Sequence, residues 1–264
     1  MLGMSLSYRN LLSPADDSLR PDSLLPKLWD RGVRSVELRA VKNTEAPENV
    51  LRVANLLWDH GFQISVHSVS RSVGGAVKDV FGPLSPVLKN LRQDELIVTL
   101  HPIDDDNAEM LTRLSDHIIE RDYPVRIALE NNRKMPDKTE GNSLMLVLDA
   151  VERADRENVG ICFDMGHYAW YTANFTDSPS TLPPQSFLSR VIHTHIHEYA
   201  EGTTHFPLEE WREPISLYVN ALGREYKGIY NVELEPGRFA HRMSAVDGYL
   251  ISADTIRNSL IKKI

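Results

Sequence analysis

The chain has 264 residues, with 29 Lys and Arg against 37 Asp and Glu for a formal charge of −8, ten His and a single Cys. One Cys excludes an intrachain disulfide and a cysteine-rich zinc or iron–sulfur site, and it favours a reducing, cytoplasmic location. The acidic balance argues against nucleic acid as a partner, because proteins that neutralise phosphates usually present a basic face. We also expect no membrane partner and no secretory signal, since no apolar run approaches the roughly 20 residues of a membrane span.

Short apolar runs alternate with longer amphipathic segments along the chain, which is typical of repeated βα units around a parallel sheet. The predicted strands end near Tyr8, Leu38, His67, His101, Glu130, Asp164, His197 and Glu235. Eight such units in about 250 residues predict an α/β fold of the (β/α)8 TIM-barrel type, a parallel eight-stranded barrel with outer helices. No linker divides the sequence, so we expect a single domain over residues 1–264.

Start and stop signals between these strands predict the outer helices. The predicted helices cover 21–32, 47–61, 107–121, a segment that starts at 142–143, 208–222 and 244–261. Two other segments, 68–84 and 171–184, read as loops. Both follow strands at the end of the barrel where enzymes of this type form their active sites, so both are candidate lids.

Side-chain parity is the most informative feature of the predicted strands. Successive strand residues point to opposite faces, and in a barrel one face meets the helices while the other points inward. In the third strand, Ile64 and Val66 share the helix-facing side, which leaves His67 inward. The same alternation places His or carboxylate side chains inward at six consecutive strand ends: His67, His101, Glu130, Asp164, the triplet His193, His195 and His197, and the pair Glu233 and Glu235.

Convergence of these carboxylates at one barrel mouth predicts a bound cation. Uncompensated carboxylates would repel one another and raise their pKa values, and a metal ion removes that repulsion. Imidazole and carboxylate ligands without a thiolate suit a divalent metal ion such as Zn, Mn, Co or Mg.

Four motifs at the ends of the fifth to eighth predicted strands carry a family resemblance. They are Leu-Glu130-Asn-Asn, Phe-Asp164-Met-Gly-His167, His193-Thr-His195-Ile-His197-Glu198 and Val-Glu233-Leu-Glu235-Pro-Gly-Arg238. In this order and spacing, the chain from about Val33 onward resembles the xylose isomerase-like barrel superfamily. That superfamily includes sugar and sugar-phosphate isomerases and epimerases, and the abasic-site nucleases of the endonuclease IV type.

The isomerase and epimerase branch implies one divalent metal held by Glu130, Asp164, His195 and Glu233, with Glu235 as the alternative to Glu233. It implies a small carbohydrate substrate and a reaction through a metal-stabilised enediolate. Glu130 and Glu233 would then act as acid and base on opposite sides of the substrate, since a weakly acidic carbon-bound proton must be removed and returned.

Three further residues are predicted to contact the substrate. His167 would orient it or assist charge stabilisation. Arg238, just past the last strand, is placed to meet a phosphate or hydroxyl group. Trp170 follows the Asp164 motif directly and is a candidate wall of a sugar pocket.

The nuclease branch is the main alternative. Its three-zinc pattern extends to His67, His101 and His205, so these residues and the nearby His197 are candidate additional metal or substrate ligands. The acidic residue expected two positions before His205 is Thr203 in this chain. That departure and the acidic charge favour an isomerase or epimerase, with a zinc phosphodiester hydrolase second and a metal-dependent lyase or dehydratase third. The sequence identifies neither the sugar nor the oligomeric state, and a homo-oligomer stays open.

Overall fold

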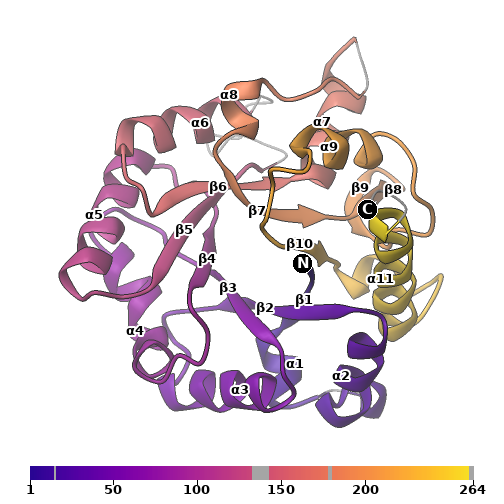
Figure 1. The fold of residues 1–264 in the computed structure, drawn as a ribbon, viewed down its shortest axis with the longest axis horizontal. Coiled ribbons are helices and arrows are strands. Elements are labelled where there is room, and N and C mark those ends of the chain that lie inside the picture. The colour runs from indigo at the N-terminus through magenta and orange to yellow at the C-terminus, as the bar shows by residue number, and fades with distance from the viewer. Residues whose placement is uncertain (15, 133–142, 178–179, 262–264) are drawn as a thin grey trace.

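A computed structural model describes residues 1–14, 16–132, 143–177 and 180–261 (Figure 1). Eight parallel strands form a closed barrel in the order β1-β2-β3-β4-β5-β6-β7-β10, and β10 pairs with β1 to close the ring. This arrangement confirms the predicted (β/α)8 fold. The barrel strands are β1 Leu2–Ser7, β2 Val33–Val41, β3 Gln63–Ser68, β4 Leu96–Leu100, β5 Val125–Glu130, β6 Val159–Asp164, β7 Val191–Ile196 and β10 Tyr230–Glu233.

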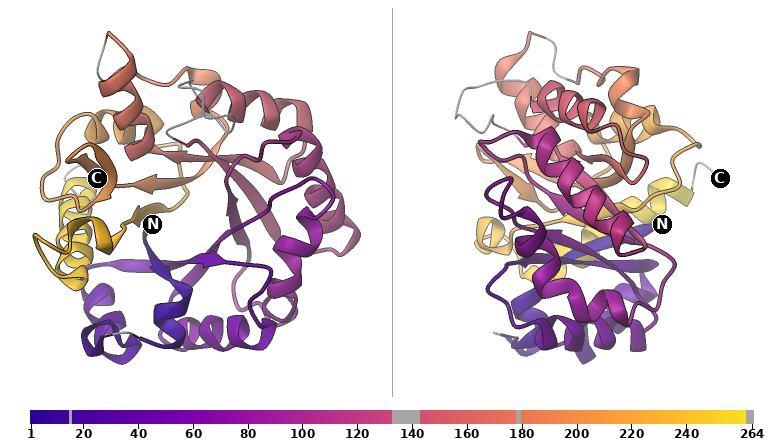
Figure 2. Two further views of the ribbon diagram at one scale, coloured as in Figure 1. Left: turned by 180° about the vertical axis from the view of Figure 1, so that it is seen from behind. Right: turned by 90° about the vertical axis from the view of Figure 1, so that its left-hand side faces the viewer.

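Helices surround the barrel on its outside, as the views in Figure 2 show. They are α1 Tyr8–Leu12, the 3-10 helix η1 Asp17–Leu19, α2 Pro21–Asp30, α3 Pro47–Asp59, α4 Ala76–Lys89, α5 Asn107–Glu120, α6 Ser143–Ala154, α7 Met165–Phe175, α8 Gln185–Leu188, α9 Ile215–Leu222, α10 Pro236–Phe239 and α11 Ala245–Ile261. A short antiparallel hairpin, β8 Glu198–Ala200 and β9 Thr203–Phe206, follows β7. Within the described part of the chain, no helix has the length and apolar character needed to cross a membrane.

The predicted strand ends agree closely with the observed ones. Glu130 and Asp164 end β5 and β6 as predicted. The largest difference is in β2, which continues beyond Leu38 to Val41 through an irregularity at Ala40, whose φ is 64°. Because a barrel strand is buried on both faces, inward residues such as Glu130 are as inaccessible to solvent as the apolar residues beneath the helices.

The two segments predicted as loops are partly helical. Most of 68–84 lies in α4, which contains Pro83 and Pro86. Local helix-breaking signals are overridden here because Val80 and Leu84 are fully buried against the rest of the core. The start of 171–184 lies in α7, whose first turn is capped by the Asp164 side chain.

One predicted helix starts later than expected, and another starts at the edge of the described residues. The helix predicted over 208–222 begins only at Ile215, after a cis peptide bond between Glu213 and Pro214, because proline at 214 stands at its N-terminus and lacks an amide hydrogen. The predicted start at 142 lies outside the described residues, and α6 is described from Ser143.

Candidate metal centre

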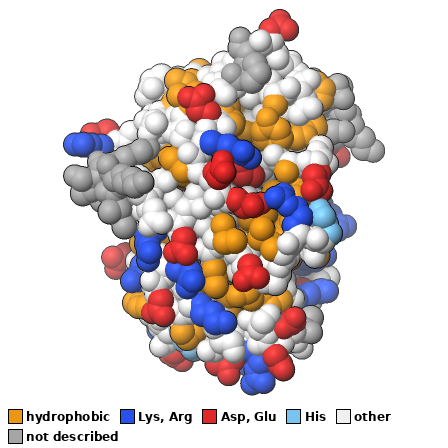
Figure 3. All heavy atoms as spheres, turned by 90° about the vertical axis from the view of Figure 1, so that its right-hand side faces the viewer, with side chains coloured by type: hydrophobic (Ala, Val, Ile, Leu, Met, Phe, Trp, Pro, Cys, Tyr) orange, Lys and Arg blue, Asp and Glu red, His pale blue; other side chains and the backbone are white. Residues whose placement is uncertain are grey.

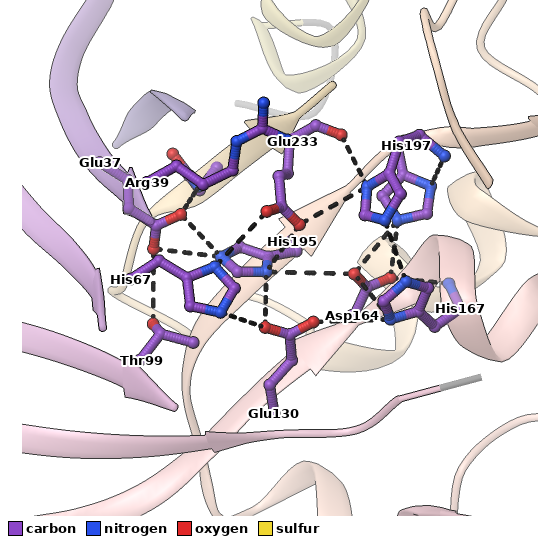
Figure 4. Close-up of polar contacts among 12 residues, drawn as sticks. Glu37, Arg39, His67, Thr99, Glu130, Asp164, His167, His195, His197 and Glu233 are labelled. Atoms are coloured by element: carbon purple, nitrogen blue, oxygen red, sulfur yellow. Dashed lines mark hydrogen bonds and ion pairs between the residues drawn. The ribbon is translucent and has the colours of Figure 1, made fainter. Parts of the chain in front are cut away.

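Four strands bring the predicted metal ligands together at one end of the barrel (Figure 4). Glu130, Asp164 and Glu233 are the last residues of β5, β6 and β10, and His195 is the penultimate residue of β7. All four are at most 3% exposed. One ligand atom from each of the four lies within 4.8 Å of the other three, which is the spacing of a metal-binding group. Strand parity therefore brings together the side chains that the sequence singled out.

The polar atoms at the centre of this group fit a divalent cation. Nδ1 of His195 lies 3.2 Å from Oε2 of Glu130, 3.3 Å from Oε2 of Glu233 and 4.0 Å from Oδ2 of Asp164. Nevertheless, this nitrogen and both carboxylate oxygens of Glu130 have no hydrogen-bond partner among the described residues. Buried polar atoms rarely lack partners, and a cation bound by nitrogen and oxygen would satisfy these.

The carboxylates and imidazoles of the cluster strongly influence one another. Burial alone would raise the pKa of Glu130, but His101 and His195 hold that pKa well below its usual range. Burial alone would lower the pKa of His195, yet the surrounding carboxylates raise it well above its usual value. For His101, Glu130 and Glu233 outweigh burial and raise the pKa to about 9. Protons therefore balance the buried carboxylates when no metal is bound, and metal binding through His195 would release a proton.

Glu233, rather than Glu235, lies in the cluster. Its carboxylate contacts His195, whereas the Glu235 side chain is 45% exposed and pairs with Nη1 of Arg39 at 3.1 Å. The reason is that β10 ends at Glu233. Glu235 lies beyond the strand, directly before the short helix α10. Parity alone does not separate the two residues because both lie on the same face of an extended strand.

Two histidines flank the cluster on the side of Glu130. Nε2 of His67 lies 3.4 Å from Oε2 of Glu130, and Nε2 of His101 lies 3.3 Å from the same oxygen. His67 also reaches Glu233, with Nδ1 3.4 Å from Oε1. These three residues, His67, His101 and Glu130, form a second group with the spacing of metal ligands.

Three histidines form a third group on the side of Asp164. Nε2 of His167 lies 3.2 Å from Nε2 of His205, and Nε2 of His197 lies 3.0 Å from Oδ1 of Asp164. The backbone N–H of His205 donates to Nδ1 of His197 at 3.0 Å, and Nε2 of His197 lies 3.1 Å from Oδ2 of Asp164. Burial, together with His197 nearby, holds the pKa of His205 well below its usual range and keeps this ring neutral.

An open cavity of about 450 Å³ lies over this cluster. Its lining includes His67, His101, His167, His205, Glu233 and Arg238. A volume of this size suits a small ligand, and the imidazoles offer it both donors and acceptors.

Of the three predicted substrate contacts, His167 and Arg238 line this cavity and Trp170 does not. Arg238 lines the cavity, where its Nη1 donates to Oγ1 of Thr203 and to the carbonyl of Thr204, both at 2.8 Å. Trp170 is not among the described residues that line the cavity. Its indole is largely buried and packs against Phe175 of the same helix, with ring centres 5.3 Å apart, so it does not wall this pocket.

Sequence reasoning missed two residues of β2 that belong to this region. Glu37 is fully buried and contacts His193 and His195, and Arg39 lines the cavity. The signal was available, because Val36 and Leu38 face the helices and the intervening Glu37 must therefore face inward.

Comparisons with known proteins give structural similarity only. No family model matches the chain, and no curated protein matches it in sequence. A solved sugar phosphate isomerase/epimerase from Parabacteroides distasonis is similar with a TM-score of 0.60, over 96% of this chain and 97% of that one, at 16% identity. A structure of concanavalin B is similar with a TM-score of 0.50, over 100% and 98% of the two chains, at 10% identity. At such identities the similarity shows the barrel fold alone, which agrees with the fold that the sequence motifs implied.

Gly166 tests whether the packing of His197 matters for stability. A Cβ atom built on Gly166 would overlap the His197 imidazole, whereas one on Gly74, in the turn before α4, meets nothing within 4 Å. We expect G166A to lower the free energy of unfolding by about 1–3 kcal/mol through overpacking. The matched variant G74A should leave stability unchanged or raise it by roughly 0.4–1 kcal/mol. Urea denaturation of both variants measures this, and equal stabilities would contradict the described packing.

Proposed function

We propose that this chain is a divalent-metal-dependent enzyme that isomerises or epimerises a small sugar or sugar phosphate. The observation that carries the proposal is the buried group of Glu130, Asp164, His195 and Glu233, whose ligand atoms converge beneath a cavity at the carboxyl end of the barrel, with those of Glu130 and Nδ1 of His195 lacking hydrogen-bond partners among the described residues. The fold shared with a solved sugar phosphate isomerase/epimerase supports the proposal without identifying a substrate.

A divalent ion held by these four residues would supply Lewis-acid polarisation of a substrate carbonyl and its neighbouring hydroxyl. Glu233 lines the cavity, so its carboxylate is placed to take a proton from a substrate carbon. Glu130 approaches His195 from another side and is the second acid/base candidate (Figure 4). The two glutamates are thus arranged around one centre, as proton removal and return on different sides of a substrate require.

The cavity histidines would orient the substrate and the two glutamates. His67 lies between Glu130 and Glu233. Its Nε2 is 3.4 Å from the Glu130 carboxylate, and its Nδ1 is 3.4 Å from the Glu233 carboxylate. Such a contact restrains both carboxylates at once, which is how a residue near the reacting groups maintains their geometry. His167 and His205 present their paired Nε2 atoms at the cavity wall, where a sugar hydroxyl group could replace the bond between them.

A zinc phosphodiester hydrolase is the second candidate function. It is favoured by the two further groups of possible ligands, His67 with His101 and Glu130, and the three histidines described above. One observation opposes the hydrolase: Thr203, at the position where an acidic residue is expected, provides no carboxylate, and its hydroxyl accepts a hydrogen bond from Arg238. On the flank of the barrel shown in Figure 3, acidic and basic side chains are interspersed, so this flank offers no single basic surface for a phosphate backbone. A metal-dependent lyase or dehydratase using the same ligands ranks third.

Metal removal and reconstitution distinguish these functions. We expect purified protein to lose aldose–ketose or epimer conversion after chelation and to regain it with Mn²⁺, Co²⁺ or Zn²⁺, because the ligand group lacks balancing charge without the ion. Elemental analysis should give about one ion per chain. Three zinc ions together with cleavage of abasic duplex DNA would favour the hydrolase, and no metal binding at all would refute both.

Substitution of the two glutamates near the end of β10 tests their assignment. E233Q should lower kcat by about 10²–10⁴-fold, since it removes a carboxylate that holds the ion and moves a proton. E235Q changes a carboxylate that lines the cavity but lies outside the ligand cluster, and it should lower kcat less than about tenfold. Steady-state kinetics with metal content measured in parallel gives the comparison. A larger loss in E235Q would exchange the roles of the two residues.

A further inference from the structure

We infer that Glu37 is a positioning residue that holds His195 in the orientation and tautomer needed for metal binding. This inference rests on the proposed metal centre and adds to it a residue that lies outside the four ligands. Glu37 is on β2, and its fully buried carboxylate extends across the barrel interior to β7 (Figure 4).

The carboxylate of Glu37 is held by donors from three other strands. Nε2 of His195 lies 3.0 Å from Oε1, and Nε2 of His193 lies 3.1 Å from Oε2. Nδ2 of Asn231 donates to Oε1 at 3.1 Å, and Oγ1 of Thr99 donates to Oε2 at 3.4 Å. Both oxygens are therefore engaged, which fixes the carboxylate firmly enough for it to orient a neighbouring ring.

The contact with Glu37 determines which nitrogen of His195 carries the proton. An ionised carboxylate only accepts hydrogen bonds, so Nε2 of His195 must donate to it. When metal binding removes the second proton of the ring, Nδ1 is therefore the nitrogen left with a free lone pair. This is the atom that faces Glu130 and Glu233 and has no hydrogen-bond partner among the described residues. A carboxylate behind a histidine in this way is a common means of preparing a metal ligand.

Removing the carboxylate would allow the opposite tautomer. With a proton on Nδ1, His195 could donate to Oε2 of Glu130, which is only 3.2 Å away. That bond would occupy the ligand atom of the histidine and one oxygen of the glutamate together. Metal binding would then also have to move the remaining ring proton to Nε2, where no carboxylate would accept a hydrogen bond from it, so affinity would fall although all four ligands were still present.

His193 shows that the arrangement is specific to His195. Both rings bond to Glu37, and both come from the inward face of β7. Only His195 also contacts the carboxylates of the candidate metal centre. His193 therefore anchors Glu37 from the side away from the metal ligands.

A metal-affinity comparison tests this role. E37Q preserves the shape of the side chain but places an amide donor beside Nε2, and we expect it to weaken Zn²⁺ binding about 10–100-fold in a chelator-competition titration. S35A is the matched control, because Ser35 is also buried on β2, shares the inward face and has no hydrogen-bond partner for its hydroxyl among the described residues. It should bind Zn²⁺ within about threefold of the wild type. A folded E37Q that binds as tightly as the wild type would overturn the inference.

A second measurement needs no change at residue 37. In wild-type protein loaded with Zn²⁺ and labelled with ¹⁵N-histidine, long-range ¹H–¹⁵N correlation reports the protonated nitrogen of each ring, and the spectrum of H195Q identifies the His195 signals. We expect a proton on Nε2 and zinc on Nδ1; the reverse arrangement would overturn the inference even if E37Q failed to fold. If the wild type binds no metal ion, the proposed function fails and this inference with it. If only the E37Q comparison fails, the metal centre stands without the role of Glu37.

Discussion

The burial of four carboxylates at one end of a barrel is the constraint on which the rest of this structure depends. Glu37, Glu130, Asp164 and Glu233 are each at most 3% exposed, and like charges repel strongly where water is excluded. The chain surrounds them with imidazoles from β3, β7 and β9 and from residues that follow β4, β6 and β7. The need to offset the carboxylate charges explains why so many histidines lie at one end of the molecule. It also explains why Nδ1 of His195 and the Glu130 oxygens, which lack hydrogen-bond partners among the described residues, lie near one another.

Much of the site could be predicted because a barrel strand has only two faces. Alternation of apolar and polar residues was sufficient to place Glu130, Asp164 and His195 inward, and the strand ends brought them together. The same rule applies to Glu37, yet it lies four residues before the end of β2. It was missed because chemistry was expected at the mouth of the barrel, whereas this carboxylate acts from beneath it.

Other features depend on contacts that no local pattern contains. Glu233 and Glu235 share a face, and only the end of β10 and the position of Arg39 separate them. Helix α4 was not predicted because it contains Pro83 and Pro86. Its stability comes from the apolar face that it buries rather than from the helix propensities of its residues. In both cases, tertiary packing determines the outcome: which glutamate joins the cluster, and whether the segment forms a helix or a loop.

Because β10 closes the barrel and lies near the end of the chain, the residues of the candidate metal centre are synthesised at different times. Glu37 and its partner Asn231 are 194 positions apart, and β10 pairs with β1 at the other end of the chain. A chain made from its N-terminus therefore presents Glu130, Asp164 and His195 before the last strand exists. Until that strand leaves the ribosome, the set of ligands has an open, hydrated side. A metal ion bound as proposed would consequently be captured late in biosynthesis, after almost the whole chain has been translated.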